Sequence, residues 1–364
     1  MIRHRVGILE MEGYVPGHVG PLARQAAMLA SNESPFLPLE RVQAAIRTSI
    51  THTNRYPDFA SSDLTGALAQ QWHLPADHVV VDSGSSTLLR NIVIACAGPE
   101  TDVLYPWPSF PSYEHAAHLV GATPIRVELT SEYRLDLNRI AAAITDRTRV
   151  VFLCLPNNPT GTTVDHAALE SFLEAVPYDV VVVVDECYRE FVTDPNAASG
   201  TRLLGRFPNV VVLKSLSKSA GLAGLRIGYA LSSPEVCALL RAVRVPFSVS
   251  SVAQAAALAC LEPEVTSALE SRITATVSER SRISRALSAE GVEVVPSQAN
   301  FLFLPRQHGA MAKVRQLADR SVLVRQIGPE GIRVSIGSRS ENDHLLACVD
   351  VFDRPAGHGR FDTR

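Results

Sequence analysis

The hydrophobic positions of residues 77–228 form short apolar runs that alternate with stretches of helical spacing. Uninterrupted apolar runs are typical of strands covered on both faces, and their alternation with helices predicts an α/β fold with a doubly wound, mostly parallel sheet. Strands are predicted at residues 78–81, 102–105, 125–129, 149–155, 180–184, 210–213 and 227–231. Two intervening stretches, 88–96 and 169–176, end at Gly98-Pro99 and at Pro177 and are predicted to be covering helices.

After Pro246 the pattern changes to a long helical region rich in alanine, serine, arginine and glutamate, which runs to Glu290. It is followed by strands predicted at residues 292–304, 322–327 and 332–336, so we expect a smaller α+β domain. Glycine and proline breakers in the first forty residues predict an arm and a crossing segment. The expected division is residues 1–39 for the arm, 40–245 for the large domain and 246–364 for the small domain, which ends in a frayed tail.

The composition is that of an ordinary soluble globular protein, with 364 residues, 46% hydrophobic and 20% charged. The formal charge is −3 and no basic run occurs, so nucleic acid is not an expected partner. The start of the chain lacks the apolar stretch of a signal peptide and no segment has the length of a membrane span. We therefore expect a cytoplasmic protein with no membrane partner. The six scattered cysteines lack metal-ligand spacing, so we expect reduced thiols and no metal site.

Lysine is nearly absent from the chain. Of 34 basic residues only Lys214, Lys218 and Lys313 are lysines, and the first two lie four residues apart after a predicted strand. Since arginine serves wherever a positive charge suffices, this clustering indicates a need for an amine that can lose its proton.

Polar motifs follow several of the predicted strands, at the edge where open α/β sheets bind ligands. The turn at 82–87 (Asp-Ser-Gly-Ser-Ser-Thr) opens a helix and offers N–H groups and hydroxyls to a phosphate. Residues 156–161 form a rigid turn carrying Asn158, and Asp185 and Tyr188 follow five apolar positions. Each motif alone is equally consistent with an ordinary turn or helix cap. Together with Lys218 they supply what pyridoxal phosphate requires, an imine-forming amine, a carboxylate for the ring nitrogen and a phosphate site.

At these residues the sequence resembles the fold-type I pyridoxal-phosphate aminotransferases, in the branch of histidinol-phosphate and aromatic amino acid aminotransferases. The resemblance runs from about residue 13 to residue 346 and implies an aspartate-aminotransferase-like fold. Its most specific motifs are residues 31–33, 54–58, 156–161, 185–188, 217–228, 297–301 and 333–336.

The resemblance implies that Lys218 forms the internal aldimine with pyridoxal 5'-phosphate and moves the substrate proton. It implies that Asp185 pairs with the ring nitrogen, that Asn158 and Tyr188 hydrogen-bond the phenolic oxygen, and that Phe110 stacks on the ring. The implied phosphate ligands are Ser85, Ser86, Ser215, Ser217, Arg226 and, from a second subunit, Tyr56. The last of these implies a homodimer.

For the small-molecule substrates, an amino acid and a 2-oxo acid, the resemblance implies that Arg333 binds the acidic group through two parallel hydrogen bonds. Arg325 on the neighbouring predicted strand and Asn32 in the crossing segment are further candidate substrate residues. Leu37, Ser86-Thr87 and Cys187 depart from the family pattern. Leu37 and its neighbours lie near the site entrance in relatives, so the departures affect expected substrate recognition rather than catalysis.

The short connection at residues 325–333 resembles that of the actinobacterial aromatic amino acid aminotransferases. Aromatic transamination is therefore the leading interpretation. Histidinol phosphate, another amino acid of specialised biosynthesis, and phospho-amino-acid decarboxylation by the same cofactor remain as alternatives. The bond held perpendicular to the cofactor ring would separate a decarboxylase from an aminotransferase.

Overall fold

The computed structural model describes residues 26–329 and 331–354. Most of the expected arm and nearly all of the expected tail lie outside these residues. A seven-stranded sheet in the order β2-β8-β7-β6-β5-β3-β4 confirms the predicted strands. Every described neighbour pairing in it is parallel except those of β8, which runs antiparallel to β2 and β7. The strands are β2 (Val79–Asp82), β3 (Asp102–Trp107), β4 (Thr123–Glu128), β5 (Thr148–Cys154), β6 (Val181–Asp185), β7 (Val210–Ser215) and β8 (Gly228–Leu231).

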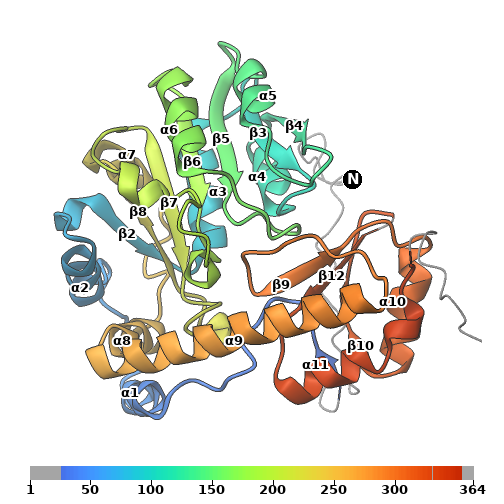
Figure 1. Ribbon diagram of the computed structural model, residues 1–364. Helices are drawn as coiled ribbons and strands as arrows, with labels where there is room; N and C mark the ends of the chain where they lie inside the picture. The colour runs from blue at the N-terminus through green and yellow to red at the C-terminus, as the bar shows by residue number, and fades with distance from the viewer. Residues whose placement is uncertain (1–25, 330, 355–364) are drawn as a thin grey trace, which may run out of the picture.

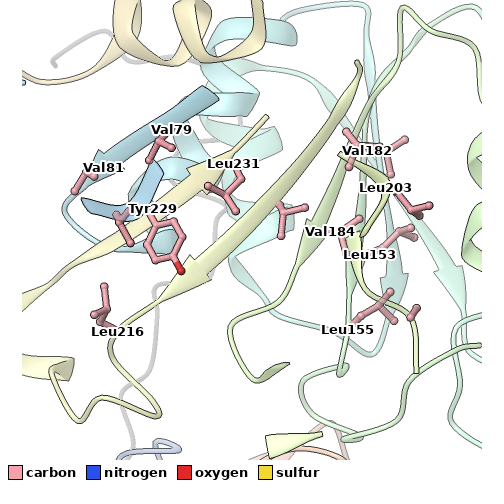
Figure 2. Close-up of a cluster of buried hydrophobic side chains, with 14 of the residues drawn as sticks. Val79, Val81, Leu153, Leu155, Val182, Val184, Leu203, Leu216, Tyr229 and Leu231 are labelled. Atoms are coloured by element: carbon pink, nitrogen blue, oxygen red, sulfur yellow. The ribbon is translucent and has the colours of Figure 1, made fainter. Parts of the chain in front are cut away.

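Helices cover both faces of this sheet (Figure 1). Alternate strand residues divide between two buried clusters, because side chains of a strand point to opposite faces. Val79 and Val81 belong to one cluster, part of which is drawn in Figure 2, whereas Val80 belongs to the other. The first cluster includes residues of α1 (Glu40–Ile50), α2 (Ser62–Trp72), α5 (Leu137–Ala142), α6 (His166–Ala175) and α8 (Ser251–Cys260). The second includes residues of α3 (Ser85–Cys96), α4 (Ser112–Val120) and α7 (Pro234–Val243).

The C-terminal part of the chain forms a smaller unit beside the sheet, coloured orange to red in Figure 1. It contains an antiparallel sheet in the order β11-β12-β9 and a parallel pair of β1 with β10. The strands are β1 (Ala27–Met28), β9 (Phe301–Leu304), β10 (Val322–Leu323), β11 (Arg325–Ile327) and β12 (Gly331–Ser335). The helices are α9 (Pro263–Ala289), α10 (Ala310–Asp319) and α11 (Arg339–Leu346).

Within residues 26–329 and 331–354, the remaining helical elements are short 3-10 helices at Ala76–His78, Arg189–Phe191, Gly200–Leu203, Ala223–Leu225 and Val349–Val351. Among the helices of the described residues, none combines the length and apolar character needed to cross a bilayer.

Two strand predictions in the smaller unit are wrong. Only the end of the predicted strand 292–304 is a strand, because residues 297–300 contact the large sheet's loops. The Gln298 N–H donates to the Gly161 carbonyl at 2.7 Å, and the Gln298 side-chain oxygen accepts from the Thr193 N–H at 2.8 Å. The predicted strand 322–327 is divided between β10 and β11, which pair in different sheets. An apolar run does not show where its pairing partner changes.

The expected boundary at residue 246 does not coincide with a change in packing. Ala253 and Ala256 of α8 are buried in the same cluster as the large sheet. Ile283 of α9 instead packs in the small unit's core, and so does Leu29 from the crossing segment. On this packing the division falls within α9, and residues 27–29 belong with the C-terminal unit. An alanine-rich helix carries no signal that assigns it to one core or the other.

Candidate active site

A cavity of about 230 Å³ lies where the central strands end, and every predicted cofactor residue except Tyr56 lines it. The residues come from the ends of different strands, as the parallel topology requires. Lining it are Ser85, Ser86, Phe110, Asn158, Asp185, Tyr188, Ser215, Ser217, Lys218 and Arg226. The structure thus brings these residues, which are distant in the sequence, together around one cavity.

Lys218 lies on the wall of this cavity, three residues after β7. Its Nζ donates to the Ser31 carbonyl at 3.2 Å. Burial, together with the charge of Arg333, lowers the pKa of Lys218 to about 8. The amine therefore loses its proton far more readily than an exposed lysine does.

Lys214, the other clustered lysine, does not reach the cavity. It is buried in β7 and pairs with Glu186 at 2.9 Å and Glu190 at 3.7 Å. Burial alone would lower the pKa of Lys214, but the two carboxylates outweigh it and raise that pKa above its usual value. Of the two clustered lysines, only Lys218 therefore has an amine that loses its proton readily, the property that the sequence indicated.

Asp185 ends β6 with a buried carboxylate. Tyr113 donates to Oδ2 at 2.8 Å and the Cys187 N–H donates to Oδ1 at 3.2 Å. Burial raises the pKa of Asp185 and these hydrogen bonds oppose the rise. In the described part of the chain no basic side chain forms an ion pair with Asp185. A cationic group in the cavity would complete its environment.

Another part of the cavity wall combines a helix N-terminus, hydroxyls and a guanidinium, the groups that commonly bind anions. Helix α3 begins at Ser85 after Gly84, so its positive end points at a cluster of hydroxyls with the Arg226 guanidinium. Gly84 has a φ of +94°, and a Cβ there would lie 2.8 Å from the Arg226 guanidinium. A Cβ on Gly228 would lie 2.6 Å from the Ser85 backbone nitrogen. Because neither glycine carries a side chain, space remains between the start of α3 and the Arg226 guanidinium, and we call this space the cradle.

Cys187, which departs from the family pattern, joins the two ends of the cavity. Its backbone N–H contacts Asp185, and its Sγ donates to the Ser85 Oγ at 3.1 Å. Burial raises the pKa of the Cys187 thiol. All six cysteines are free thiols.

Asn32 occupies a different place from the one expected of a substrate residue. It is buried in a left-handed conformation and lines neither this cavity nor the neighbouring one. Its Nδ2 donates to the Tyr188 hydroxyl at 3.1 Å, and its Oδ1 accepts from the Ser335 hydroxyl at 2.9 Å. Asn32 therefore connects the cavity tyrosine to β12.

A second cavity of about 650 Å³ adjoins the first, and Phe110 and Asn158 line both. Arg333 lines the second cavity and donates to the Asn158 Oδ1 and to the Ala30 carbonyl, each at 2.6 Å. Arg325, its registered partner across β11 and β12, lines the same cavity. The two candidate substrate arginines thus lie beside the candidate cofactor site.

Several residues of the two cavities were missed by sequence reasoning. Trp107, Tyr133 and Phe303 supply aromatic surface to the second cavity. Trp107 ends β3, so the strand-end rule used for Asp185 would have found it. Phe303 lies inside a buried strand, and no pattern distinguishes it from a core residue. Tyr113, which lies behind Asp185, is likewise indistinguishable from core by its spacing.

Tyr56 lies outside the cavity of its own chain. It is 82% exposed, and its ring stacks on Phe247 with centroids 4.6 Å apart. Phe59 and Phe247 are also exposed, so the three rings form a contiguous aromatic patch on the surface.

Comparison with known proteins places this architecture in one family. Residues 25–349 match the family model described as aminotransferase class I and II. The aromatic amino acid aminotransferase of Thermobifida fusca is 44% identical over 94% of both chains. That of Streptomyces avermitilis is 41% identical over 94% of this chain and 96% of its own.

Solved structures agree with the sequence relatives. The histidinol-phosphate aminotransferase of Sinorhizobium meliloti in complex with pyridoxal-5'-phosphate superposes with a TM-score of 0.87 at 28% identity, covering 96% of this chain and 98% of that chain. A Thermus thermophilus aspartate aminotransferase mutant shares the fold with a TM-score of 0.79 at 22% identity, covering 92% and 98%. The chain belongs to the class I and II aminotransferases, and it is an aminotransferase of fold type I.

Proposed function

We propose that the protein transfers the amino group of an aromatic amino acid to a 2-oxo acid, with pyridoxal 5'-phosphate as cofactor. The single observation that carries the cofactor assignment is the placement of Lys218, with its lowered pKa, in one cavity with Asp185 and the hydroxyl-lined end of α3. The names of the relatives at 41–44% identity support the aromatic substrate.

The residues present fit this cofactor. The buried carboxylate of Asp185 has hydrogen-bond donors but no cation, which suits a protonated ring nitrogen. The cradle kept open by Gly84 and Gly228 suits a phosphate. Ser85, Ser86, Ser215, Ser217 and Arg226 would hold that phosphate, Phe110 would cover the ring, and Asn158 and Tyr188 would bond its oxygen.

When bound, the cofactor supplies an electron sink for the substrate's Cα. Lys218 binds the cofactor and afterwards accepts and returns the proton at Cα, a task that suits an amine with a pKa near 8. Asp185, as a carboxylate, would pair with a protonated ring nitrogen and stabilise its proton. Tyr188, oriented by Asn32, fixes the ring oxygen.

The second cavity would receive the substrate. Arg333 is held by Asn158 and the Ala30 carbonyl, and it would bind the substrate carboxylate. Trp107, Tyr133 and Phe303 would contact an apolar, planar side chain. This combination favours an aromatic amino acid.

Histidinol phosphate is the second candidate, and one observation favours it. Arg325 lines the same cavity as Arg333, and two arginines in one pocket suit a phosphate as well as a carboxylate. The experiment is to follow the visible absorption of the cofactor-loaded protein while phenylalanine or, in a separate sample, histidinol phosphate is added. Conversion to the pyridoxamine spectrum by phenylalanine alone supports the proposal. Conversion by histidinol phosphate alone would assign histidinol phosphate, instead of an aromatic amino acid, as the substrate.

We further propose that the protein acts as a homodimer in which Tyr56 completes the phosphate site of the partner subunit. The exposure of Tyr56, Phe59 and Phe247, which form one aromatic cluster, supports a covered surface there.

A further inference from the structure

Tyr113 lies directly behind the candidate cofactor cavity without lining it. It is fully buried in the first turn of α4, and its hydroxyl donates to the Asp185 Oδ2 at 2.8 Å. Its ring stacks on Phe152 with centroids 4.4 Å apart and planes at 13°. The Phe110 ring packs almost perpendicular to the Tyr113 ring, with centroids 5.7 Å apart and an interplanar angle of 88°. The ring cannot move without disturbing both neighbours.

Resting on the proposed function, we propose that Tyr113 is the positioning residue that fixes the Asp185 carboxylate toward the cofactor's ring nitrogen and keeps it ionised. Two donors, Tyr113 on Oδ2 and the Cys187 N–H on Oδ1, determine the rotation of the carboxylate. With each oxygen held, the carboxylate keeps one orientation toward the cavity.

The hydroxyl also acts on the charge of Asp185. An O–H donor stabilises a carboxylate more than a carboxylic acid, and charge-assisted bonds are the stronger ones. Burial acts in the opposite direction and raises the pKa of Asp185. The tyrosine itself remains a donor, because burial and the nearby charge of Asp185 raise the pKa of Tyr113 well above its usual value.

The test replaces only the hydroxyl. Tyr113→Phe keeps the stacked ring and removes the donor to Asp185. Tyr105→Phe is the matched control, because Tyr105 is also fully buried, its ring lies 6.3 Å from that of Tyr113, and its hydroxyl contacts Arg126. Pyridoxal phosphate is titrated into each cofactor-free protein, and the dissociation constant is measured from pH 6 to pH 8.

We expect Tyr113→Phe to weaken cofactor binding about tenfold, the scale of a hydrogen bond to a charged group, and most strongly at the acidic end of the range. With cofactor labelled at the ring nitrogen, the ¹⁵N shift should move toward the unprotonated value. Tyr105→Phe should change neither quantity. Equal values for the two variants would overturn the inference. If the wild-type protein itself fails to bind the cofactor, the proposed function fails instead.

A second background distinguishes the loss of the hydrogen bond to Asp185 from a disturbed packing of the residue 113 ring. In Asp185→Asn no charge remains to be stabilised, so adding Tyr113→Phe should produce little further loss of cofactor affinity. A tenfold loss that persists in this background would assign Tyr113 a purely structural role.

Discussion

Lys214, inside β7, and Lys218, three residues after the end of that strand, have opposite electrostatic environments. Glu186 and Glu190 hold the Lys214 ammonium as a buried ion pair, whereas burial and Arg333 destabilise the Lys218 ammonium. The strand and the turn after it thus separate a charge that stabilises the fold from an amine available for chemistry.

Substitution separates these two roles. Lys218→Ala should abolish transamination while the melting temperature changes little and some cofactor still binds through Asp185 and the serines. Lys214→Met should instead leave Glu186 buried without its cation, which costs about 3–5 kcal/mol of unfolding free energy. Urea unfolding and steady-state kinetics measure both quantities. A stable Lys214→Met protein, or an active Lys218→Ala protein, would contradict this division.

Capture of the cofactor by Lys218 should depend on pH. Because the pKa of Lys218 is lowered to about 8, its neutral fraction rises as pH increases toward that value and levels off above it. The rate at which cofactor-free protein develops the visible band should be about tenfold lower at pH 7 than on the plateau. Stopped-flow absorption from pH 6.5 to 9.5 measures it, and a midpoint near that of a free lysine would refute the lowered value.

Gly228 offers a test of the phosphate cradle. A Cβ there would meet the Ser85 backbone nitrogen at 2.6 Å and the Lys214 carbonyl at 2.8 Å, both rigid. Gly228→Ala should therefore shift the start of α3, lower stability by about 1–3 kcal/mol and weaken cofactor binding. Gly224→Ala is the control, since nothing lies within 4 Å of its added Cβ. Similar cofactor affinities for the two variants would argue against the cradle.

The arginines of β11 and β12 should differ in their effects on substrate. Arg333→Ala is expected to raise the KM for the amino acid at least about tenfold, because a bidentate charged contact is lost. Its effect on cofactor affinity should be smaller. Arg325→Ala should raise KM less, because it is only half-buried beside the cavity. Steady-state kinetics on cofactor-saturated protein compares the KM values of the two variants. A larger increase for Arg325→Ala would assign the binding of the substrate carboxylate to Arg325 instead of Arg333.

Sharing of Tyr56 between subunits can be tested by mixing inactive variants. Tyr56→Ala and Lys218→Ala should each lose activity, but a mixed dimer would contain one complete site. Unfolding and refolding the two together in equal amounts should restore about a quarter of wild-type activity by random pairing. No recovery, with mixed dimers shown by mass spectrometry, would place Tyr56 outside the partner's site.

The sequence predicted the large sheet well, because its strands are buried on both faces and read as plain apolar runs. The strand-end rule then located Asp185, Asn158 and Lys218. The spacing of the two lysines could not show which of them forms ion pairs with carboxylates, since Glu190 is distant from Lys214 in the sequence and approaches it only in the folded chain. The sequence also could not show that Asn32 turns toward Tyr188, nor that the hydroxyl of the core residue Tyr113 donates to Asp185.

The bond between Asn32 and Ser335 joins residues 303 positions apart. A ribosome adds roughly 5–20 residues per second, so Asn32 waits roughly 15–60 s before its partner is even synthesised. During that interval the large sheet can form, yet Tyr188 lacks its orienting amide and β1 lacks β10. A nascent or truncated chain that lacks Ser335 is therefore expected to leave Asn32, and through it Tyr188, without its final support at the cavity wall.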